Sequence, residues 1–143
     1  MSHPVSQLHS SNPALDRLER LVAEVGDLQS KLILLVGNSS KTLLLRQLAQ
    51  RLSVAPRNVG ATLGQRLAAT PVFERGFSAN ELLRDITVSA RSNAPLLLDN
   101  LEVLFEPSLK INPLDLIRRL AHARSVVAVW PGELRDDRLV YAR

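Results

Sequence analysis

Short, nearly continuous apolar runs alternate along the chain with longer segments in which apolar residues recur every three or four positions. The continuous runs have the composition of strands covered on both faces, and the spaced segments have the period of amphipathic helices. The predicted strands cover 31–36, 58–61, 96–98 and 125–130, with a short edge strand at 139–141. The first run is apolar enough for a central strand of a parallel sheet. The alternation predicts an α/β domain of three layers with a mostly parallel sheet.

Two Asn-Pro pairs mark the starts of helices. Asn12-Pro13 and Asn112-Pro113 each place a good N-cap residue before a proline at the first helical position. The helix that begins at Asn12 precedes the first predicted strand. We expect its apolar side to pack on the sheet, and contacts to a nucleotide or to a neighbouring subunit are the alternative.

The remaining helices are predicted from their apolar period and from one further cap. Helices are expected at 41–52 and 62–70, and 71–77 is expected to be a loop. Ser78 and Glu81 have the spacing of a capping box, which predicts that another helix begins there.

A polar turn joins the first predicted strand to the helix expected at 41–52. A strand, a polar turn and a helix that opens with Lys-Thr are typical of a phosphate-binding loop, or P-loop. In such a loop the backbone N–H groups and the positive end of the helix face a phosphate, the lysine adds a positive charge, and the threonine hydroxyl can bind Mg²⁺. The residues predicted to bind a nucleotide in this way are Gly37, Asn38, Ser39, Ser40, Lys41 and Thr42.

The predicted loop is shorter than the usual pattern, G-x-x-x-x-G-K-[ST]. Only three residues separate Gly37 from Lys41, and Ser40 stands where a second glycine normally permits a positive φ. The alternative is therefore a buried strand that turns into a helix without binding a ligand.

An acid follows the predicted strand at 96–98, as in a Walker B element. Parallel strands end at the same edge of a sheet, so we expect Asp99 to lie near Thr42, where both would hold Mg²⁺. The alternative is a strand-end aspartate that caps the next turn. Asn100 and Glu102 are the candidates for orienting an attacking water, although Asn100 cannot act as a base.

The strand predicted at 125–130 is expected beside the first strand, where it could carry a polar group that senses a γ-phosphate. Its end is Trp130-Pro131-Gly132, which offers no such side chain, and Trp130 is expected in the core or an interface. The short loop, the asparagine at 100 and the missing sensor predict weak ATP hydrolysis, or nucleotide binding without turnover.

Three arginines near the last predicted helix, Arg118, Arg119 and Arg124, suit contact with a phosphate across a subunit interface. We favour the alternative, that they are surface arginines. The 18 basic residues of the chain include only three lysines, and the formal net charge is +4. Because arginine binds phosphate in a bidentate way, DNA is a candidate partner. An ordinary solvated surface is again the alternative.

Length and composition limit the number of domains and the other classes of protein to which the chain could belong. The 143 residues suit one domain at 12–143 after a polar tail at 1–11, which is expected to be flexible. The chain has no cysteine, and its three histidines lie too far apart in sequence to suggest a metal motif. We find no membrane-spanning run and no signal peptide, so a cytoplasmic location is expected.

The segment 96–134, LLLDNLEVLFEPSLKINPLDLIRRLAHARSVVAVWPGEL, resembles the BrxF family, the small P-loop proteins of BREX phage-defence systems. Its most specific parts are 98–102 (LDNLE), 104–105 (LF) and 129–132 (VWPG), and the resemblance extends to 139–142 and to 31–52. It implies a cytoplasmic bacterial protein that acts with other BREX proteins against phage DNA. It also implies a nucleotide site at Gly37, Lys41, Thr42 and Asp99.

Two functions are therefore in view. The first is a P-loop accessory protein of a BREX-type phage-defence complex, which binds ATP and Mg²⁺, hydrolyses ATP weakly or not at all, and forms a homo-oligomer. The second is a non-enzymatic scaffold or DNA-binding adaptor with a degenerate P-loop. A hydrolase or metal enzyme has little support, because the chain has no G-x-S-x-G motif, no cysteine nucleophile and no histidine pair at ligand spacing.

Overall fold

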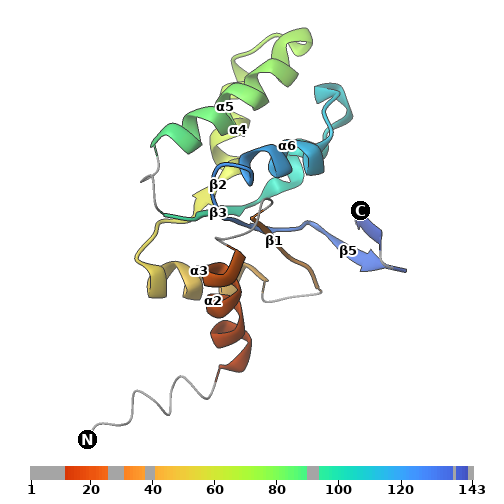
Figure 1. Ribbon diagram of the computed structural model, residues 1–143. Helices are drawn as coiled ribbons and strands as arrows, with labels where there is room; N and C mark the ends of the chain where they lie inside the picture. Colours follow the sequence, from red (N-terminus) through yellow and green to blue (C-terminus); the bar gives the residue numbers. More distant parts are fainter. Residues whose placement is uncertain (1–11, 26–30, 38–40, 90–93, 137, 142–143) are drawn as a thin grey trace, which may run out of the picture.

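The computed structural model describes residues 12–25, 31–37, 41–89, 94–136 and 138–141, and the tail predicted at 1–11 lies outside them. Strands and helices alternate as predicted (Figure 1). The helices are α2 (Pro13–Val25), α3 (Lys41–Leu52), α4 (Val59–Ala68), α5 (Arg75–Ser89) and α6 (Pro113–Leu120). Short 3-10 helices are η1 (Val72–Glu74), η2 (Leu101–Phe105) and η3 (Pro107–Leu109). The strands are β1 (Leu32–Leu35), β2 (Arg57–Asn58), β3 (Leu96–Asp99), β4 (Val126–Val129), β5 (Gly132–Arg135) and β6 (Arg138–Tyr141).

Four strands form one parallel sheet in the order β1-β4-β3-β2. Strand β4 pairs with β1 from Leu32↔Val126 onward and with β3 from Leu96↔Val126 onward. The predicted α/β class and the predicted place of the strand at 125–130 beside the first strand are confirmed. Among the described residues no strand pairs with the outer side of β1, so the expectation of a central strand is wrong. Residues 31–36 are apolar because both faces of β1 are covered. An apolar pattern reports covered faces and does not show whether a strand pairs on one side or on both.

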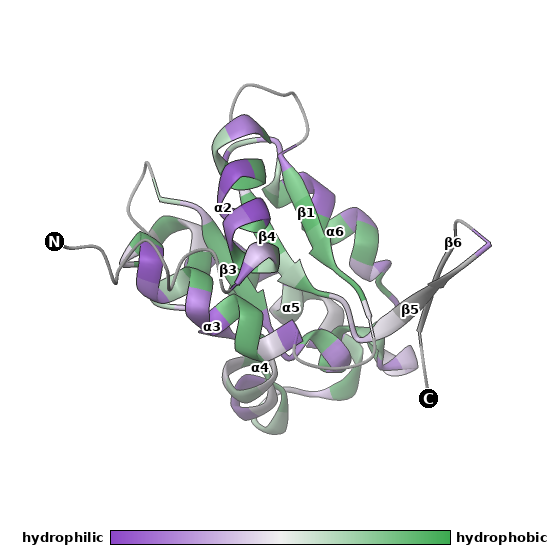
Figure 2. Ribbon diagram, turned by 90° about the horizontal axis from the view of Figure 1, so that it is seen from below, coloured by the Kyte–Doolittle hydropathy of each residue, from purple (hydrophilic) through white to green (hydrophobic). Residues whose placement is uncertain are grey.

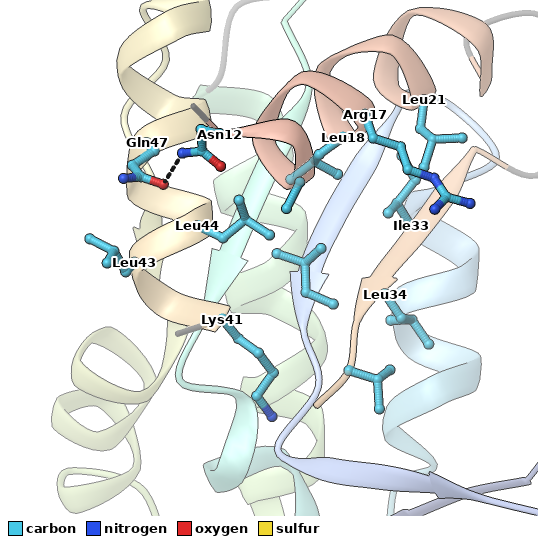
Figure 3. Close-up of a pocket in the computed structure, with 13 residues that line it drawn as sticks. Asn12, Arg17, Leu18, Leu21, Ile33, Leu34, Lys41, Leu43, Leu44 and Gln47 are labelled. Carbon is cyan, nitrogen blue, oxygen red and sulfur yellow. Dashed lines mark hydrogen bonds between the residues drawn. The ribbon is translucent and has the colours of Figure 1, made fainter. Parts of the chain in front are cut away.

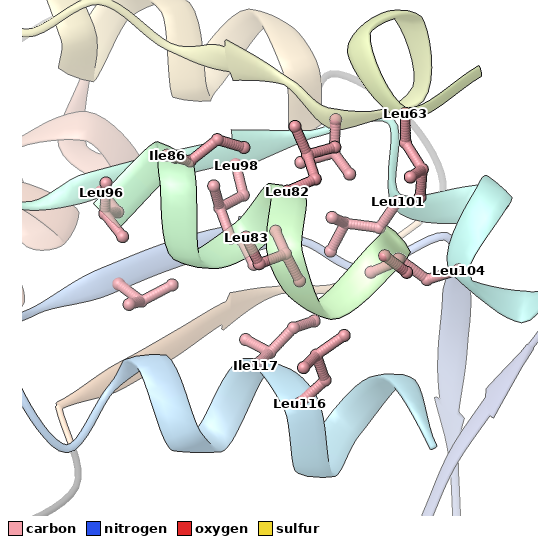
Figure 4. Packing of buried hydrophobic residues seen from close by; sticks show 14 of the residues in the cluster. Leu63, Leu82, Leu83, Ile86, Leu96, Leu98, Leu101, Leu104, Leu116 and Ile117 are labelled. Atoms are coloured by element: carbon pink, nitrogen blue, oxygen red, sulfur yellow. The ribbon is translucent and has the colours of Figure 1, made fainter. Parts of the chain in front are cut away.

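The side chains of the sheet alternate between two cores, one on each face. Helices α2 and α3 cover one face, and α4, α5 and α6 cover the other, which gives three layers (Figure 1). Strands β1 and β4 are hydrophobic along their length, whereas the helices also carry hydrophilic residues (Figure 2). In β3, for example, Leu96 and Leu98 point to the larger core while Leu97 points to the smaller one. Figure 4 shows the larger core, in which Leu82 and Leu83 of α5 lie among residues of β3 and α6.

Helix α2 is held to α3 by buried leucines and by one arginine. Leu15 and Leu18 are buried in the smaller core, as the packing interpretation predicted. Arg51 of α3 donates to Asp16 at 2.7 Å and to Glu19 at 3.0 Å. The hydrogen bond to Asp16, followed by the one to Glu19, raises the pKa of the Arg51 guanidinium above its usual value.

The start of α4 differs from the prediction for the second strand. Strand β2 covers only Arg57–Asn58, and the predicted strand residues that follow Asn58 already belong to α4. The cause is a local cap, because the Asn58 side chain accepts a hydrogen bond from the Ala61 backbone N–H at 2.9 Å. The asparagine therefore ends the strand and begins the helix in one step.

The predicted capping box is also wrong. Helix α5 begins at Arg75, directly after η1, so Ser78 and Glu81 lie inside the helix and part of the predicted loop at 71–77 is helical. Ser78 is buried and Glu81 is exposed. Gly76 permits the earlier start, since it lets the first turn of α5 approach η3 so closely that a Cβ would lie 2.5 Å from the Leu109 carbonyl oxygen.

Both predicted Asn-Pro caps are confirmed, and the last described strands form a separate small sheet. Asn12 accepts from the Leu15 backbone N–H at 3.2 Å. Asn112 accepts from the Asp115 backbone N–H at 3.1 Å and α6 follows it. Strands β5 and β6 pair antiparallel, and β6 contains the predicted edge strand at 139–141. Of the helices in the described part of the chain, none is long and apolar enough to cross a membrane.

Two helical glycines should respond to alanine in opposite directions. At Gly64 in α4 a Cβ would meet nothing within 4 Å, whereas at Gly76 it would meet backbone. Gly64→Ala should therefore raise the free energy of unfolding by about 0.5–1 kcal/mol. Gly76→Ala should lower it by about 1–3 kcal/mol, because the helix must move away from η3. Urea unfolding measures both, and a stabilised Gly76→Ala variant would contradict the contact.

Candidate functional site

The carboxyl ends of β1, β3 and β4 meet at one edge of the sheet, and α3 begins at that edge. Parallel α/β sheets bind ligands where strands end in this way. Gly37 follows β1, and its φ of 151° lies in the range that glycine adopts readily. A Cβ there would meet nothing within 4 Å, so the conformation and not the space favours glycine. Asn38, Ser39 and Ser40 lie outside the described residues.

The structure brings Thr42 and Asp99 into direct contact. The Thr42 hydroxyl, in the first turn of α3, donates to Asp99 Oδ1 at 3.2 Å, and both residues are half-buried. The same oxygen accepts the Asn100 backbone N–H at 2.8 Å. The Asp99 carboxylate therefore binds both the N–H that follows its strand and the hydroxyl of the helix that opens with Lys-Thr, whereas η2 itself begins at Asn100 without a side-chain cap.

Lys41 lies at the same edge of the sheet. Its Nζ donates to the backbone carbonyl of Trp130 at 2.6 Å (Figure 3 shows the side chain). Trp130 directly follows β4, and its N–H donates to the Leu35 carbonyl of β1 at 3.0 Å. The ammonium group is therefore held by a neutral oxygen at the end of the strand between β1 and β3.

Asn100 adopts a left-handed conformation, with φ and ψ both 56°. Asparagine tolerates this region better than most residues, so backbone geometry alone explains its presence. Gly60 of α4 packs against this turn, because a Cβ there would lie 3.0 Å from the Asn100 carbonyl oxygen. The sequence interpretation missed Gly60, although a glycine two residues after an N-cap asparagine was a signal that another backbone lies close.

Glu102 takes no part in the hydrogen bonds of the Thr42–Asp99 pair. Glu102 lies in η2 and is exposed, and within the described ranges it forms no hydrogen bond to either residue. Trp130 is buried, as expected for a core residue. Its ring packs edge-on against the ring of Phe105, with the ring centroids 5.2 Å apart. The predicted part of Glu102 in orienting an attacking water stays a prediction, and the indole of Trp130 offers no base.

A pocket of about 690 Å³ opens between α2, β1 and α3, with Lys41 at one end (Figure 3). Its wall is mostly apolar and includes Leu18, Ile33, Leu35 and Leu44. Besides Lys41, the polar residues on the wall are Asn12, Arg17 and Gln47, and Asn12 Nδ2 donates to Gln47 Oε1 at 3.2 Å. Pockets of this size and composition suit a small organic ligand.

The donor set at the sheet edge fits a magnesium ion that is shared with phosphates. Mg²⁺ prefers oxygen ligands and usually keeps several waters or phosphate oxygens beside one or two carboxylates. Thr42 and Asp99 offer one hydroxyl and one carboxylate at hydrogen-bonding distance. In the part of the chain that the structure describes, no group of three or more His, Cys, Asp or Glu side chains could hold a metal by itself.

The three arginines singled out in the sequence divide into two kinds. Arg124 donates to the Ala94 carbonyl at 3.3 Å, which ties it to the segment before β3. Arg118 and Arg119 end α6 and are exposed, and they form no ion pair with any residue that the structure places. Only the latter two are available to a partner.

Comparison with protein-family models, with curated proteins and with solved structures finds no match to this chain. The chemistry of its own residues is therefore the basis for assigning a function.

Substitutions at position 100 should follow backbone conformation. Asn100→Gly should leave the free energy of unfolding nearly unchanged, because glycine accepts φ of 56° freely. Asn100→Val should lower it by about 1–2 kcal/mol, since a β-branched residue resists the left-handed region. Urea unfolding of both variants is the test, and a valine variant as stable as the wild type would refute the conformational explanation.

Proposed function

We propose that the protein binds a nucleoside triphosphate with Mg²⁺, as an accessory protein with weak or no ATP hydrolysis. The observation that supports this most directly is the convergence of Lys41, Thr42 and Asp99 at one edge of the sheet. A positive charge, a hydroxyl and a carboxylate are the three groups that a triphosphate–magnesium unit requires there.

Each group has a distinct part in binding. Lys41 leaves the neutral Trp130 carbonyl for a phosphate oxygen, which is the stronger acceptor because it is charged. Thr42 and Asp99 would hold the Mg²⁺ ion through their oxygens, and the ion would screen the phosphate charge beside the Asp99 carboxylate. The base and sugar have room in the apolar pocket beside Lys41, where the Asn12 and Gln47 amides offer polar contacts.

Weak turnover follows from what surrounds Asp99. Hydrolysis needs a group that orients or deprotonates the attacking water. Asn100 is committed to a turn, and its amide has no basic form. Glu102 is exposed on η2. The Trp130 carbonyl already accepts from Lys41, and an indole is not a base.

The cellular setting is proposed on the resemblance to the BrxF family alone. The protein would act in the cytoplasm with other BREX proteins in defence against phage DNA, and nucleotide binding would regulate its assembly with them. A site that binds without rapid hydrolysis suits a regulatory part in such a complex.

ATP with Mg²⁺ should stabilise the protein through Lys41. At a ligand concentration of about 100 times Kd, the free energy of unfolding should rise by about 2.7 kcal/mol. Lys41→Ala should abolish the rise, and Lys31→Ala, which changes the lysine at the opposite end of β1, should retain it. Thermal unfolding and calorimetry measure the effect, and the fluorescence of the single tryptophan should change on binding because Lys41 leaves the Trp130 carbonyl.

An equal stabilisation of the wild type and Lys41→Ala would exclude this site. Absence of any stabilisation at saturating ATP would exclude the proposed function.

The DNA-binding adaptor has one observation in its favour. Arg118 and Arg119 are both exposed in the last turn of α6, and among the described residues neither is paired with a carboxylate. Guanidinium groups that are free of carboxylates can contact a phosphate backbone.

If the adaptor function holds, DNA affinity should fall steeply with salt. Each phosphate contact contributes about −0.9 to the slope of log K against log salt. Arg118→Ala and Arg119→Ala should each make that slope less steep by roughly one unit, while Arg20→Ala on α2 leaves it unchanged. Titration of a labelled duplex at several salt concentrations gives the slope, and affinity that does not depend on salt would rule out phosphate-driven binding.

A further inference from the structure

Helix α5 carries apolar side chains on two opposite sides. On the inner side Ala79, Leu82 and Leu83 are buried in the larger core (Figure 4). On the outer side Phe77 is 66% exposed and Val88 is 79% exposed. A helix that is apolar on both sides normally has a partner on both sides. The inner side has its partner in the larger core, whereas no residue that the structure describes covers Phe77 or Val88 on the outer side.

A second phenylalanine extends the same surface. Phe73, in η1 just before α5, is 88% exposed. The chain has only three phenylalanines, and two of them are therefore largely exposed within four residues of one another, in η1 and in the first turn of α5. Large aromatic side chains are enriched at protein–protein contacts, and an exposed cluster of them marks such a contact.

The outer side of α5 forms a regular stripe. Phe77, Glu81, Arg84 and Val88 follow one another at spacings of four, three and four residues. This spacing puts the four side chains along one line of the helix and is the spacing of helices that pack side by side. Glu81 and Arg84 are exposed, and neither forms an ion pair with any residue placed in the structure.

The stripe is complementary to itself. Its four positions are symmetric about the midpoint between Leu82 and Leu83, so an antiparallel second copy presents the same stripe in reverse. Phe77 then faces Val88 of the partner subunit. Glu81 likewise faces Arg84 of the partner subunit. A two-fold axis repeats each contact, which gives an apolar pair at both ends and two ion pairs at the centre.

We propose that the chain forms a homodimer through this stripe, with α5 antiparallel to α5 of a second copy. The contact is of the two-fold kind in which both copies use the same surface. Helix α5 covers the face of the sheet opposite α2 and α3, so the dimer leaves the pocket beside Lys41 open (Figure 1). One helix face is small beside the roughly 1,200–2,000 Å² that stable complexes bury, and the dimer is accordingly weak.

The first test is the mass in solution as a function of concentration. Sedimentation velocity of the full chain should show monomer at low micromolar concentration and dimer at high micromolar concentration. Glu81→Arg and Arg84→Glu each put like charges opposite one another twice, and each should weaken association by on the order of tenfold or more. The matched control is Arg20→Glu, which makes the same charge change as Arg84→Glu on α2 and should leave association unchanged.

The decisive test is rescue. An equimolar mixture of Glu81→Arg and Arg84→Glu chains pairs opposite charges again, and it should dimerise as the wild type does. The double variant Glu81→Arg/Arg84→Glu should also dimerise. Rescue shows that both single variants are folded and that the charges face one another. A wild type that stays monomeric at every concentration, single variants that associate normally, or failure of both rescues would each overturn the proposal.

Discussion

The pairing of β4 with both β1 and β3 is the constraint on which the candidate site depends. Because all three strands run parallel and end at one edge, Gly37, Asp99 and Trp130 are brought together from segments far apart in sequence. Helix α3 begins at that edge, so Lys41 and Thr42 reach the ends of β4 and β3 respectively. Without β4 between the other two strands, the lysine would lose its carbonyl partner.

Helices α2 and α3, which cover the smaller core, form the walls of the pocket beside Lys41. The Asn12 side chain uses both ends of its amide, since its oxygen accepts from the Leu15 N–H at 3.2 Å and its nitrogen donates to Gln47. One residue therefore caps α2 and links it to α3 across the pocket. The shape of the pocket is thus set by the same contacts that hold the two helices together.

Much of the architecture could be predicted from the sequence, because apolar period and Asn-Pro caps are local signals. The convergence of Thr42 and Asp99 was also predictable, since parallel strands share an edge. The failures have physical reasons. Asn58 could end a strand or begin a helix, and the structure shows that it does both, because its own side chain caps α4. The start of α5 depends on the approach of Gly76 to Leu109, which no local pattern contains.

The candidate site was harder to predict in its details than in its location. Asn100 was interpreted through the chemistry of its amide, whereas the structure explains it by a left-handed backbone. Glu102 was included for its proximity in sequence, but η2 exposes it. The position of the Lys41 ammonium could not be inferred at all, because its partner is a main-chain oxygen and every residue has one.

That last feature bears on how the site can vary. The acceptor for Lys41 belongs to the peptide group of residue 130, so replacing the indole with another side chain does not remove the oxygen. Substitutions at position 130 can change the packing of the surrounding core while Lys41 keeps its carbonyl partner. The position of the Lys41 ammonium group therefore depends on the path of the backbone and not on which side chain residue 130 carries.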